Sequence, residues 1–330
     1  MLKINKPLRH AGIMPNYQCT AACRHCLYAC SPTFGGGYMS ETTMDEMFGL
    51  LREGRCYSIH IGGGEPFLDF EGLLTLLSKA KKFGMMVDYI ETNGYWAREE
   101  SVVSKRLAAL EKIGADTLCI SVDPFHSEYV PYAYPLLLAE ICRKRRFGYF
   151  LWQDCFLPMM KHVSPETAHN RAALENSIDK DYVYNTATAY GIRLGGRAIN
   201  IEMEYSTCKP LENLLKTNRP CPDLVSTGHF HVDMYNQFIP PGCTGLVLPM
   251  AEVVRGITPG KYPVYEALYR AGVTALYALA RTHGFVANKA GYTSRCALCF
   301  FIRMYLSEKN IFAELCAEHY IEAMKYYGRT

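Results

Sequence analysis

The sequence predicts an α/β fold, in which a parallel sheet curls toward a partial (β/α)6 TIM-like barrel. Two observations predict it. From the N-terminus to about residue 200, six short apolar runs alternate with stretches of helical spacing, which is typical of a parallel sheet with crossover helices. Six units also fall short of the eight that close a full (β/α)8 barrel. The pattern changes after residue 200, so we predict one domain over residues 1–200 and an extension over residues 201–330.

Each predicted element rests on a local pattern. The six predicted strands are the apolar runs Ile13–Tyr17, Tyr57–Ile61, Met86–Ile90, Thr117–Val122, Tyr149–Cys155 and Ile192–Ile199. The predicted helices between them are Glu41–Arg52, Phe70–Lys82, Glu99–Ile113, Leu136–Arg146 and Pro165–Ala189. Ser40 is the expected N-cap of the first helix, and helix-ending glycines follow at Gly84, Gly114, Gly148 and Gly191. In the extension we predict a hairpin over Phe230–Pro240 and helices over Val264–Arg281 and Ile302–Tyr327.

Composition excludes several classes of protein. The formal net charge of +3 over 330 residues is too small to indicate a nucleic-acid-binding protein. The start MLKINKPLRH lacks the apolar core of a signal peptide, and no apolar stretch reaches the roughly 18 residues that a membrane helix needs. We therefore expect a cytoplasmic protein without membrane partners. In that reducing compartment the 14 cysteines are not expected to form disulfides, so clustered ones indicate metal or Fe–S binding.

Three cysteines follow the first predicted strand with C-x3-C-x2-C spacing, at Cys19, Cys23 and Cys26. Three thiolates on one short loop can bind three irons of a cubane cluster and leave the fourth iron open to a small molecule. Sites with four cysteine ligands close the cluster and favour electron transfer instead. His25 lies inside the loop and Cys30 follows it, so from this loop alone a zinc site stays open.

A glycine-rich motif follows the second predicted strand. Gly62, Gly63 and Gly64 let a ligand approach the backbone closely, and the carboxylate of Glu65 can receive an ammonium group. Alone, such a run is often only a tight turn. Because this run lies about 40 residues after the cysteine loop, it indicates a ligand-binding site much more strongly than it would alone.

Together the two motifs resemble those of the radical S-adenosylmethionine (SAM) superfamily. CTAACRHC is similar to the cysteine signature of that family, and GGGEP is similar to its GGE motif, which binds the methionyl amino group of SAM. The resemblance covers at least residues 11–200. It implies that Cys19, Cys23 and Cys26 bind a [4Fe–4S] cluster, that SAM chelates the open iron, and that Gly63, Gly64 and Glu65 line the methionine site.

Weaker matches add candidate SAM-binding residues at later strand ends. Asn93 lies in a Thr-Asn-Gly run after the third predicted strand, and Ser121 and Asp123 end the fourth. A turn and a strand cap explain these residues equally well. Arg197 at the sixth predicted strand could pair with the SAM carboxylate as a bidentate fork, and Arg193 is a second candidate. His126 could move a proton or bind substrate, although a loop or helix-cap role is the simpler interpretation.

A second cysteine set lies in the extension. Cys221 precedes the predicted hairpin, Cys243 closes it, and Cys296 and Cys299 form a C-x2-C unit. The set resembles the SPASM/Twitch extensions of radical SAM enzymes, which implies an auxiliary [4Fe–4S] cluster. The full SPASM pattern has more cysteines, which argues for one auxiliary cluster or none. Structural zinc stays open, with Cys208 and Cys316 as substitute ligands or bystanders.

The resemblance implies reductive cleavage of SAM to a 5′-deoxyadenosyl radical, which takes a hydrogen atom from substrate. An external electron donor such as flavodoxin or ferredoxin would reduce the cluster. The resemblance also implies that members acting on peptides usually carry a peptide-recognition domain ahead of the barrel, or borrow one from a separate protein. Only 18 residues precede Cys19 here, so we expect a small-molecule substrate, or a peptide delivered by a partner. Methyl or sulfur transfer by the same radical chemistry is an alternative. A non-catalytic Fe–S or zinc protein is a further one, and GGGEP, which an electron carrier does not need, argues against it.

Overall fold

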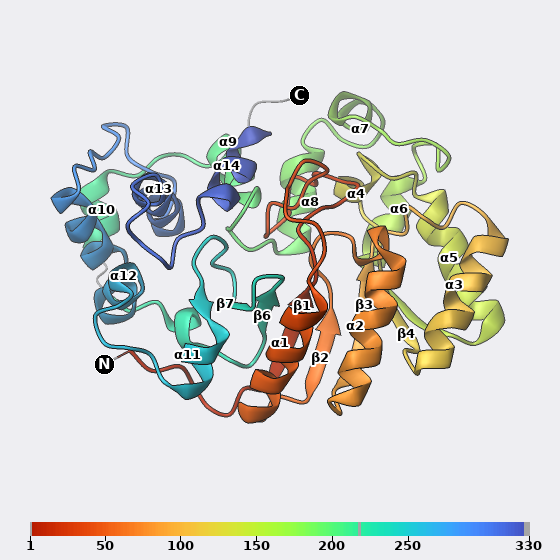
Figure 1. Cartoon of the computed structure of the whole chain (residues 1–330). Coiled ribbons are helices and arrows are strands. Elements are labelled where there is room, and N and C mark those ends of the chain that lie inside the picture. Colours follow the sequence, from red (N-terminus) through yellow and green to blue (C-terminus); the bar gives the residue numbers. More distant parts are fainter. Residues whose placement is uncertain (1, 217–218, 327–330) are drawn as a thin grey trace.

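One mixed sheet of eight strands organises the whole molecule (Figure 1). The computed structural model describes residues 2–216 and 219–326. The strand order is β5-β4-β3-β2-β1-β6-β7-β8. The strands are β1 (His10–Met14), β2 (Ser58–Ile61), β3 (Met86–Thr92), β4 (Thr117–Ser121), β5 (Gly148–Trp152), β6 (Phe230–Asp233), β7 (Gln237–Ile239) and β8 (Leu248–Pro249). The first six pair in parallel and the last two are antiparallel, so the predicted α/β fold class is confirmed.

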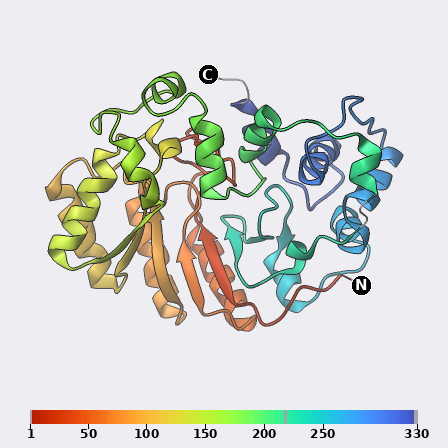
Figure 2. The same ribbon diagram turned by 180° about the vertical axis from the view of Figure 1, so that it is seen from behind.

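Helices cover one face of the parallel strands, and Figure 2 shows the opposite face. The helices of the parallel half are α1 (Glu41–Glu53), α2 (Phe70–Lys82), α3 (Glu100–Ile113), α4 (Pro124–Ser127), α5 (Ala133–Arg145), α6 (Leu157–Met160), α7 (Arg171–Ser177), α8 (Tyr182–Tyr190) and α9 (Ala198–Tyr205). The predicted N-cap is confirmed, because the side chain of Ser40 accepts from the backbone N–H of Thr43. The single helix predicted over Pro165–Ala189 is wrong: α7 and α8 are separate, and the C-cap of α7 lies at Ile178.

The predicted sixth strand, Ile192–Ile199, is also wrong. This segment is a turn followed by the start of α9. Gly196 has φ +52°, and a Cβ there would lie 2.5 Å from the carbonyl oxygen of Cys26, so the backbone packs directly against the cysteine loop. The sixth parallel strand is β6, which pairs with β1 at the other side of the sheet. The boundary expected at residue 200 therefore falls inside a helix, and the sheet continues into the C-terminal part.

The C-terminal part combines the predicted hairpin with a group of helices. β6 and β7 pair as predicted for Phe230–Pro240. The helices are α10 (Leu211–Leu215), α11 (Met250–Arg255), α12 (Pro263–Thr282), α13 (Arg295–Ser307) and α14 (Ala317–Lys325). The helix predicted over Ile302–Tyr327 is two helices, and its last residue lies outside the described residues. Among the described residues, no helix combines the length and the apolar character that crossing a bilayer requires.

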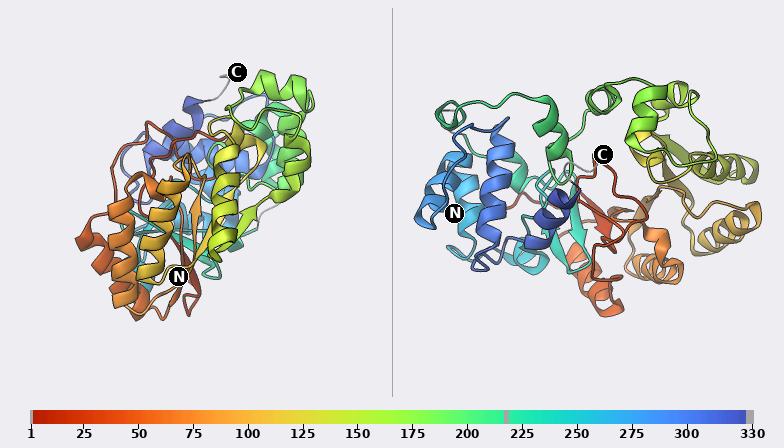
Figure 3. Two further views of the ribbon diagram at one scale, coloured as in Figure 1. Left: turned by 90° about the vertical axis from the view of Figure 1, so that its right-hand side faces the viewer. Right: turned by 90° about the horizontal axis from the view of Figure 1, so that it is seen from above.

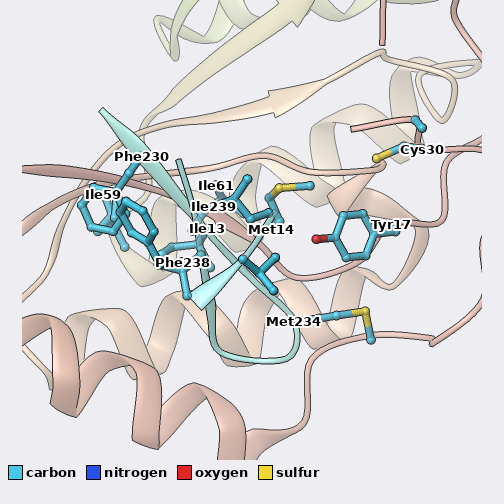
Figure 4. Close-up of a cluster of buried hydrophobic side chains, with 14 of the residues drawn as sticks. Ile13, Met14, Tyr17, Cys30, Ile59, Ile61, Phe230, Met234, Phe238 and Ile239 are labelled. Atoms are coloured by element: carbon cyan, nitrogen blue, oxygen red, sulfur yellow. The ribbon is translucent and has the colours of Figure 1, made fainter. Parts of the chain in front are cut away.

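The core binds the two parts together. Figure 4 shows Ile13 of β1 and Ile59 of β2 beside Phe230 of β6 and Phe238 of β7. Nearby, the buried hydroxyl of Tyr17 donates a 2.9 Å hydrogen bond to the carboxylate of Asp233, which lies at the end of β6. Seen from above, the two groups of helices lie on either side of the cysteine loop (Figure 3). The loop is therefore held by both halves of the chain.

Candidate functional site

A cavity of about 470 Å³ opens where the carboxyl ends of the parallel strands meet. This is where α/β barrels gather their chemistry, and the volume is in the range of small-molecule sites. Its walls include these residues from the strand ends and the following loops: Cys19, Cys23, Cys26, Cys30, Gly63, Gly64, Glu91, Asn93, Ser121, His126, Trp152, Tyr190 and Arg193. The structure therefore brings together the three cysteines, two of the glycines, and the polar residues Asn93 and Ser121.

The three predicted cluster cysteines face this cavity from one loop. Two N–H groups point at the sulfur of Cys19: the backbone N–H of Ala21 at 3.4 Å and the side-chain amide of Asn93 at 3.6 Å. Such donors stabilise a thiolate and tune the potential of a cluster bound to it. A hydrogen bond from the Cys30 thiol, helped by the charge of Arg197, lowers the pKa of Cys26 to about 5 although burial opposes this. Burial raises the pKa of Cys19 and of Cys23, so Cys26 is the cysteine of this loop that most readily becomes a thiolate before any iron is bound.

Arg197 holds the cysteine loop from behind. Its side chain is only 2% exposed and donates to the backbone carbonyls of Cys23 at 3.0 Å, Ala29 at 2.8 Å, and Cys30. Arg197, which we predicted to pair with the SAM carboxylate, thus lies behind the loop and is not among the residues that line the cavity. Arg193, which lines the cavity, has a guanidinium available to an anionic group there.

The glycine run also packs against this loop. A Cβ at Gly64 would lie 2.0 Å from the carbonyl oxygen of Gln18, and Gly63 has φ +104°. The backbone N–H of Gly64 donates to Asn16, and that of Glu65 donates to Gln18. The packing of the protein itself therefore excludes side chains at positions 63 and 64. As a result, this part of the cavity wall consists of backbone without projecting side chains.

Glu65, which we predicted to receive an ammonium group, lies behind that wall and is not among the residues that line the cavity. Its carboxylate is 1% exposed and accepts from the backbone N–H of Asn93 at 2.8 Å, that of Phe67 at 3.1 Å, and the Thr92 hydroxyl at 2.9 Å. Burial raises its pKa to about 7, although these three donors oppose the shift. Glu65 thus shapes the end of β3 and places Asn93. The carboxylate that does line the cavity is Glu91, whose side chain is 42% exposed.

Asp123 is likewise buried rather than open to the cavity. It caps α4 by accepting from the backbone N–H of His126 at 3.0 Å, and it accepts from the Nδ1 of the same residue at 2.7 Å. Burial opposes ionisation, but these contacts with His126 lower the pKa of Asp123 to about 2. His126 therefore presents its other edge to the cavity, where it contacts Cys23.

The C-terminal cysteines lie together, away from the cavity. Cys221 and Cys243 share a hydrogen bond that lowers the pKa of Cys221 to about 7, and Cys299 lies close enough to both to interact electrostatically. Cys296 and Cys299 lie near the amino end of α13, and burial raises the pKa of both thiols, to about 11 for Cys296. The buried guanidinium of Arg303 lies beside this group and donates to the carbonyl of Thr244 at 2.9 Å. Folding thus brings together four cysteines that are distant in sequence.

The family model for the radical SAM superfamily matches residues 13–151, which run from β1 to β5 and contain the cysteine loop, the glycine run, Asn93 and Ser121. This part of the chain is a radical SAM domain. Such a domain implies a [4Fe–4S] cluster and SAM as cofactors. Three cysteines of one loop on one cavity wall fit such a cluster, and the remaining cavity fits a small-molecule cofactor.

Two curated relatives match part of this radical SAM protein. YydG of Bacillus subtilis (strain 168), whose description names peptide biosynthesis, is 26% identical over 113 residues, which cover 34% of this chain and 35% of that protein. The uncharacterized protein MJ0804 of Methanocaldococcus jannaschii is 30% identical over 127 residues, covering 38% of each chain. The match therefore spans little more than a third of either relative.

Two solved structures show a distant likeness to this chain. The structure of native anSMEcpe with bound AdoMet is 14% identical, with a TM-score of 0.42, and the match covers 97% of this chain and 95% of that one. Streptococcus suis SuiB bound to its precursor peptide SuiA is 13% identical, with a TM-score of 0.36, and the match covers 88% and 76%.

The sequence analysis missed a histidine cluster beneath the cavity. His10, His60, His229 and His231 come from β1, β2 and the start of β6, and His229 and His231 line the cavity floor. Burial lowers the pKa of all four, to about 3 for His231, so these imidazoles are neutral. The signal was present in the segments HAGIM, SIHI and HFHVD, where histidines take the alternate positions that face the barrel interior.

Proposed function

We propose that this radical SAM enzyme cleaves SAM reductively and abstracts a hydrogen atom from a peptide or small-molecule substrate bound in the same cavity. The observation that carries this proposal is the convergence of Cys19, Cys23 and Cys26 with the glycine wall and polar strand ends on one 470 Å³ cavity. When bound there, a [4Fe–4S] cluster with SAM supplies the electron for that cleavage. An electron carrier has no need of such a cavity beside its cluster.

The chain's own residues would then have separate tasks. The three cysteines bind the cluster, and Asn93 and the N–H of Ala21 stabilise the charge on Cys19. Gly63 and Gly64 let the methionine part of SAM lie flat against backbone, while Arg193 offers a cation for its carboxylate. The enclosing walls keep water away from a reactive radical.

Two features favour a peptide substrate over a small metabolite. The matched Bacillus subtilis relative is described by peptide biosynthesis. The cavity rim also carries two aromatic side chains that suit peptide contacts, since Trp152 is 45% exposed and its indole N–H donates to the hydroxyl of Tyr190 at 2.6 Å. An external one-electron donor of the flavodoxin or ferredoxin class completes the proposed reaction.

The test is SAM cleavage by the full chain, reconstituted anaerobically with iron and sulfide and reduced with dithionite. We expect 5′-deoxyadenosine from the wild type and from Cys155→Ala, whose exposed thiol lies outside the cavity lining. A triple Cys19/Cys23/Cys26→Ala variant should form none. Product at the wild-type rate from the triple variant would overturn the proposal. With candidate peptides in deuterated form, transfer of deuterium to 5′-deoxyadenosine identifies the substrate.

We also propose one auxiliary [4Fe–4S] cluster on Cys221, Cys243, Cys296 and Cys299. A tetrahedral zinc site with Zn–S bonds of 2.3 Å needs sulfurs only about 3.8 Å apart. Among the described residues, no group of three ligands whose atoms lie within 4.8 Å of one another contains a cysteine. Apart from the hydrogen-bonded pair Cys221 and Cys243, this wider spacing supports a multi-iron cluster, whose corners are each bound by a different cysteine.

Metal analysis separates the two alternatives at this second site. The reconstituted wild type should hold about eight irons, four for each cubane. The triple Cys19/Cys23/Cys26→Ala variant should keep about four irons, and a further Cys299→Ala change should remove them. One zinc and no iron in the triple variant would show structural zinc, and would leave the first proposal intact.

A further inference from the structure

The histidine cluster at the cavity floor has the geometry of a metal site. The rings of His10, His60 and His229 are nearly parallel, with interplanar angles of 10–14°, and all three pairs of ring centroids are 5.1 Å apart. Three rings in one stack would place the outer two at twice the spacing of neighbours. Equal spacings mean that the rings surround a common point.

That point lies at a distance suited to coordination. The centre of a triangle with sides of 5.1 Å is about 3 Å from each ring centroid. A Zn–N bond of about 2.0–2.1 Å plus the distance from nitrogen to ring centre comes within a few tenths of an ångström of this value. One ring nitrogen from each histidine lies within 4.8 Å of the others. Small side-chain rotations would bring all three nitrogens onto one ion.

The outward nitrogens of His10 and His60 face polar partners of the kind that metal-binding histidines use. Nδ1 of His10 lies 2.7 Å from the hydroxyl of Ser58 and 3.2 Å from the carboxylate of Asp88, while its Nε2 faces inward, 2.9 Å from Nδ1 of His60. Nε2 of His60 points away from the centre, 3.7 Å from the carboxylate of Glu91. The Asp88 carboxylate and the Ser58 hydroxyl behind His10 fix the tautomer of that imidazole and increase the basicity of its coordinating nitrogen.

The barrel interior is shaped to receive these rings. Gly12 of β1 lies between His60 of β2 and His231 of β6 in the strand register. A Cβ at Gly12 would lie 2.3 Å from the His231 ring and 2.5 Å from the His60 ring. His231, held by a 2.7 Å hydrogen bond with the Tyr28 hydroxyl, stands nearly perpendicular to His60 and His229 on the cavity side. The absence of a side chain at position 12 therefore makes room for the cluster.

We propose that His10, His60 and His229 bind one divalent transition-metal ion of the zinc class beneath the cavity. The site is separate from both cysteine sets and does not depend on the proposed radical chemistry. A three-histidine site leaves a fourth position, as in catalytic zinc sites, and His229 and His231 place that position toward the cavity. The fourth ligand is thus water or an oxygen of the bound substrate, such as a carboxylate or a peptide carbonyl.

The test is zinc binding by the full chain without a histidine tag, after anaerobic reconstitution of its clusters. Dialysis against micromolar ZnCl2 followed by elemental analysis should show about one zinc per chain. His229→Ala, at an exposed position that folding tolerates, should lose this zinc, and the exposed His162→Ala should keep it. Asp88→Asn should weaken zinc binding about 10- to 100-fold, as loss of a carboxylate behind a metal-binding histidine does.

X-ray absorption at the zinc edge distinguishes this site from zinc in a cysteine set. We expect nitrogen neighbours at about 2.0–2.1 Å and no sulfur shell at about 2.3 Å. Equal zinc content in the wild type and His229→Ala, or a sulfur shell in the wild type that His229→Ala leaves unchanged, would overturn the proposal. The proposed function survives that result if 5′-deoxyadenosine is still formed.

Discussion

Replacing Arg197 with alanine tests how the cysteine loop is held. The buried guanidinium donates to three backbone carbonyls, of Cys23, Ala29 and Cys30. Each buried acceptor left without a donor costs about 1–3 kcal/mol, so even the low end of that range gives about 3 kcal/mol for three. At about 1.4 kcal/mol for each factor of ten, the native loop would lose about 100-fold in population.

Two measurements follow for Arg197→Ala. With an unfolding entropy of about 2.1 cal/mol/K per residue, a loss of 3 kcal/mol lowers the melting temperature of a chain of this length by about 4 °C. The reconstituted variant should also lose iron to a chelator much faster than the wild type. Arg193→Ala is the matched control, because that side chain is 63% exposed and its ion pair with Asp223, at 3.6 Å, is a surface one. Wild-type melting and wild-type iron retention in Arg197→Ala would refute the reasoning.

Two further predictions concern stability. Burial raises the pKa of Glu65 from 4.5 to about 7, so the folded chain binds more protons than the unfolded chain between these values, and stability should fall as pH rises through this range. Urea unfolding of the cluster-free protein from pH 5 to 8 should show a shallower fall for Glu65→Gln, and equal slopes would contradict this. Gly12→Ala should cost about 1–3 kcal/mol by overpacking against His60 and His231. Gly49→Ala in α1, where nothing lies within 4 Å, should be neutral or add about 0.5–1 kcal/mol in the same urea assay; equal costs at both positions would count against the packing argument.

The sequence predicted the strands, helices and motifs that depend on residues close together in the chain. It missed the features that depend on contacts between residues far apart in the chain. The five strands β1–β5 and helices such as α2 follow from local periodicity and capping, and both motifs of the cavity lie directly after their strands. Nothing local shows that the sixth parallel strand is Phe230–Asp233, because its partner β1 is more than 200 residues earlier. Ile192–Ile199 has an apolar pattern, but Gly196 in a left-handed turn and the approach to Cys26 prevent a strand there.

The same limit applies to the site. The cysteine and glycine motifs could be assigned because each is contiguous, and the family resemblance supplied roles for them. Whether a side chain faces the cavity or lies behind its wall is decided by tertiary packing, so the sequence did not distinguish Glu65 from Glu91. The histidine cluster escaped notice because its members are distributed over three strand segments that only the sheet brings together.

The pairing of β1 with β6 has a consequence for how the protein is made. A ribosome completes β1 long before it reaches residue 230, so the emerging chain carries a strand with one edge unpaired. An unpaired edge is a template for association with other chains, and contacts between residues far apart in sequence form slowly. A gene fragment ending near residue 200 would leave that edge open permanently, so we expect it to aggregate on expression. Exchange of C-terminal parts between relatives is restricted for the same reason, since any replacement must supply a strand that completes the sheet.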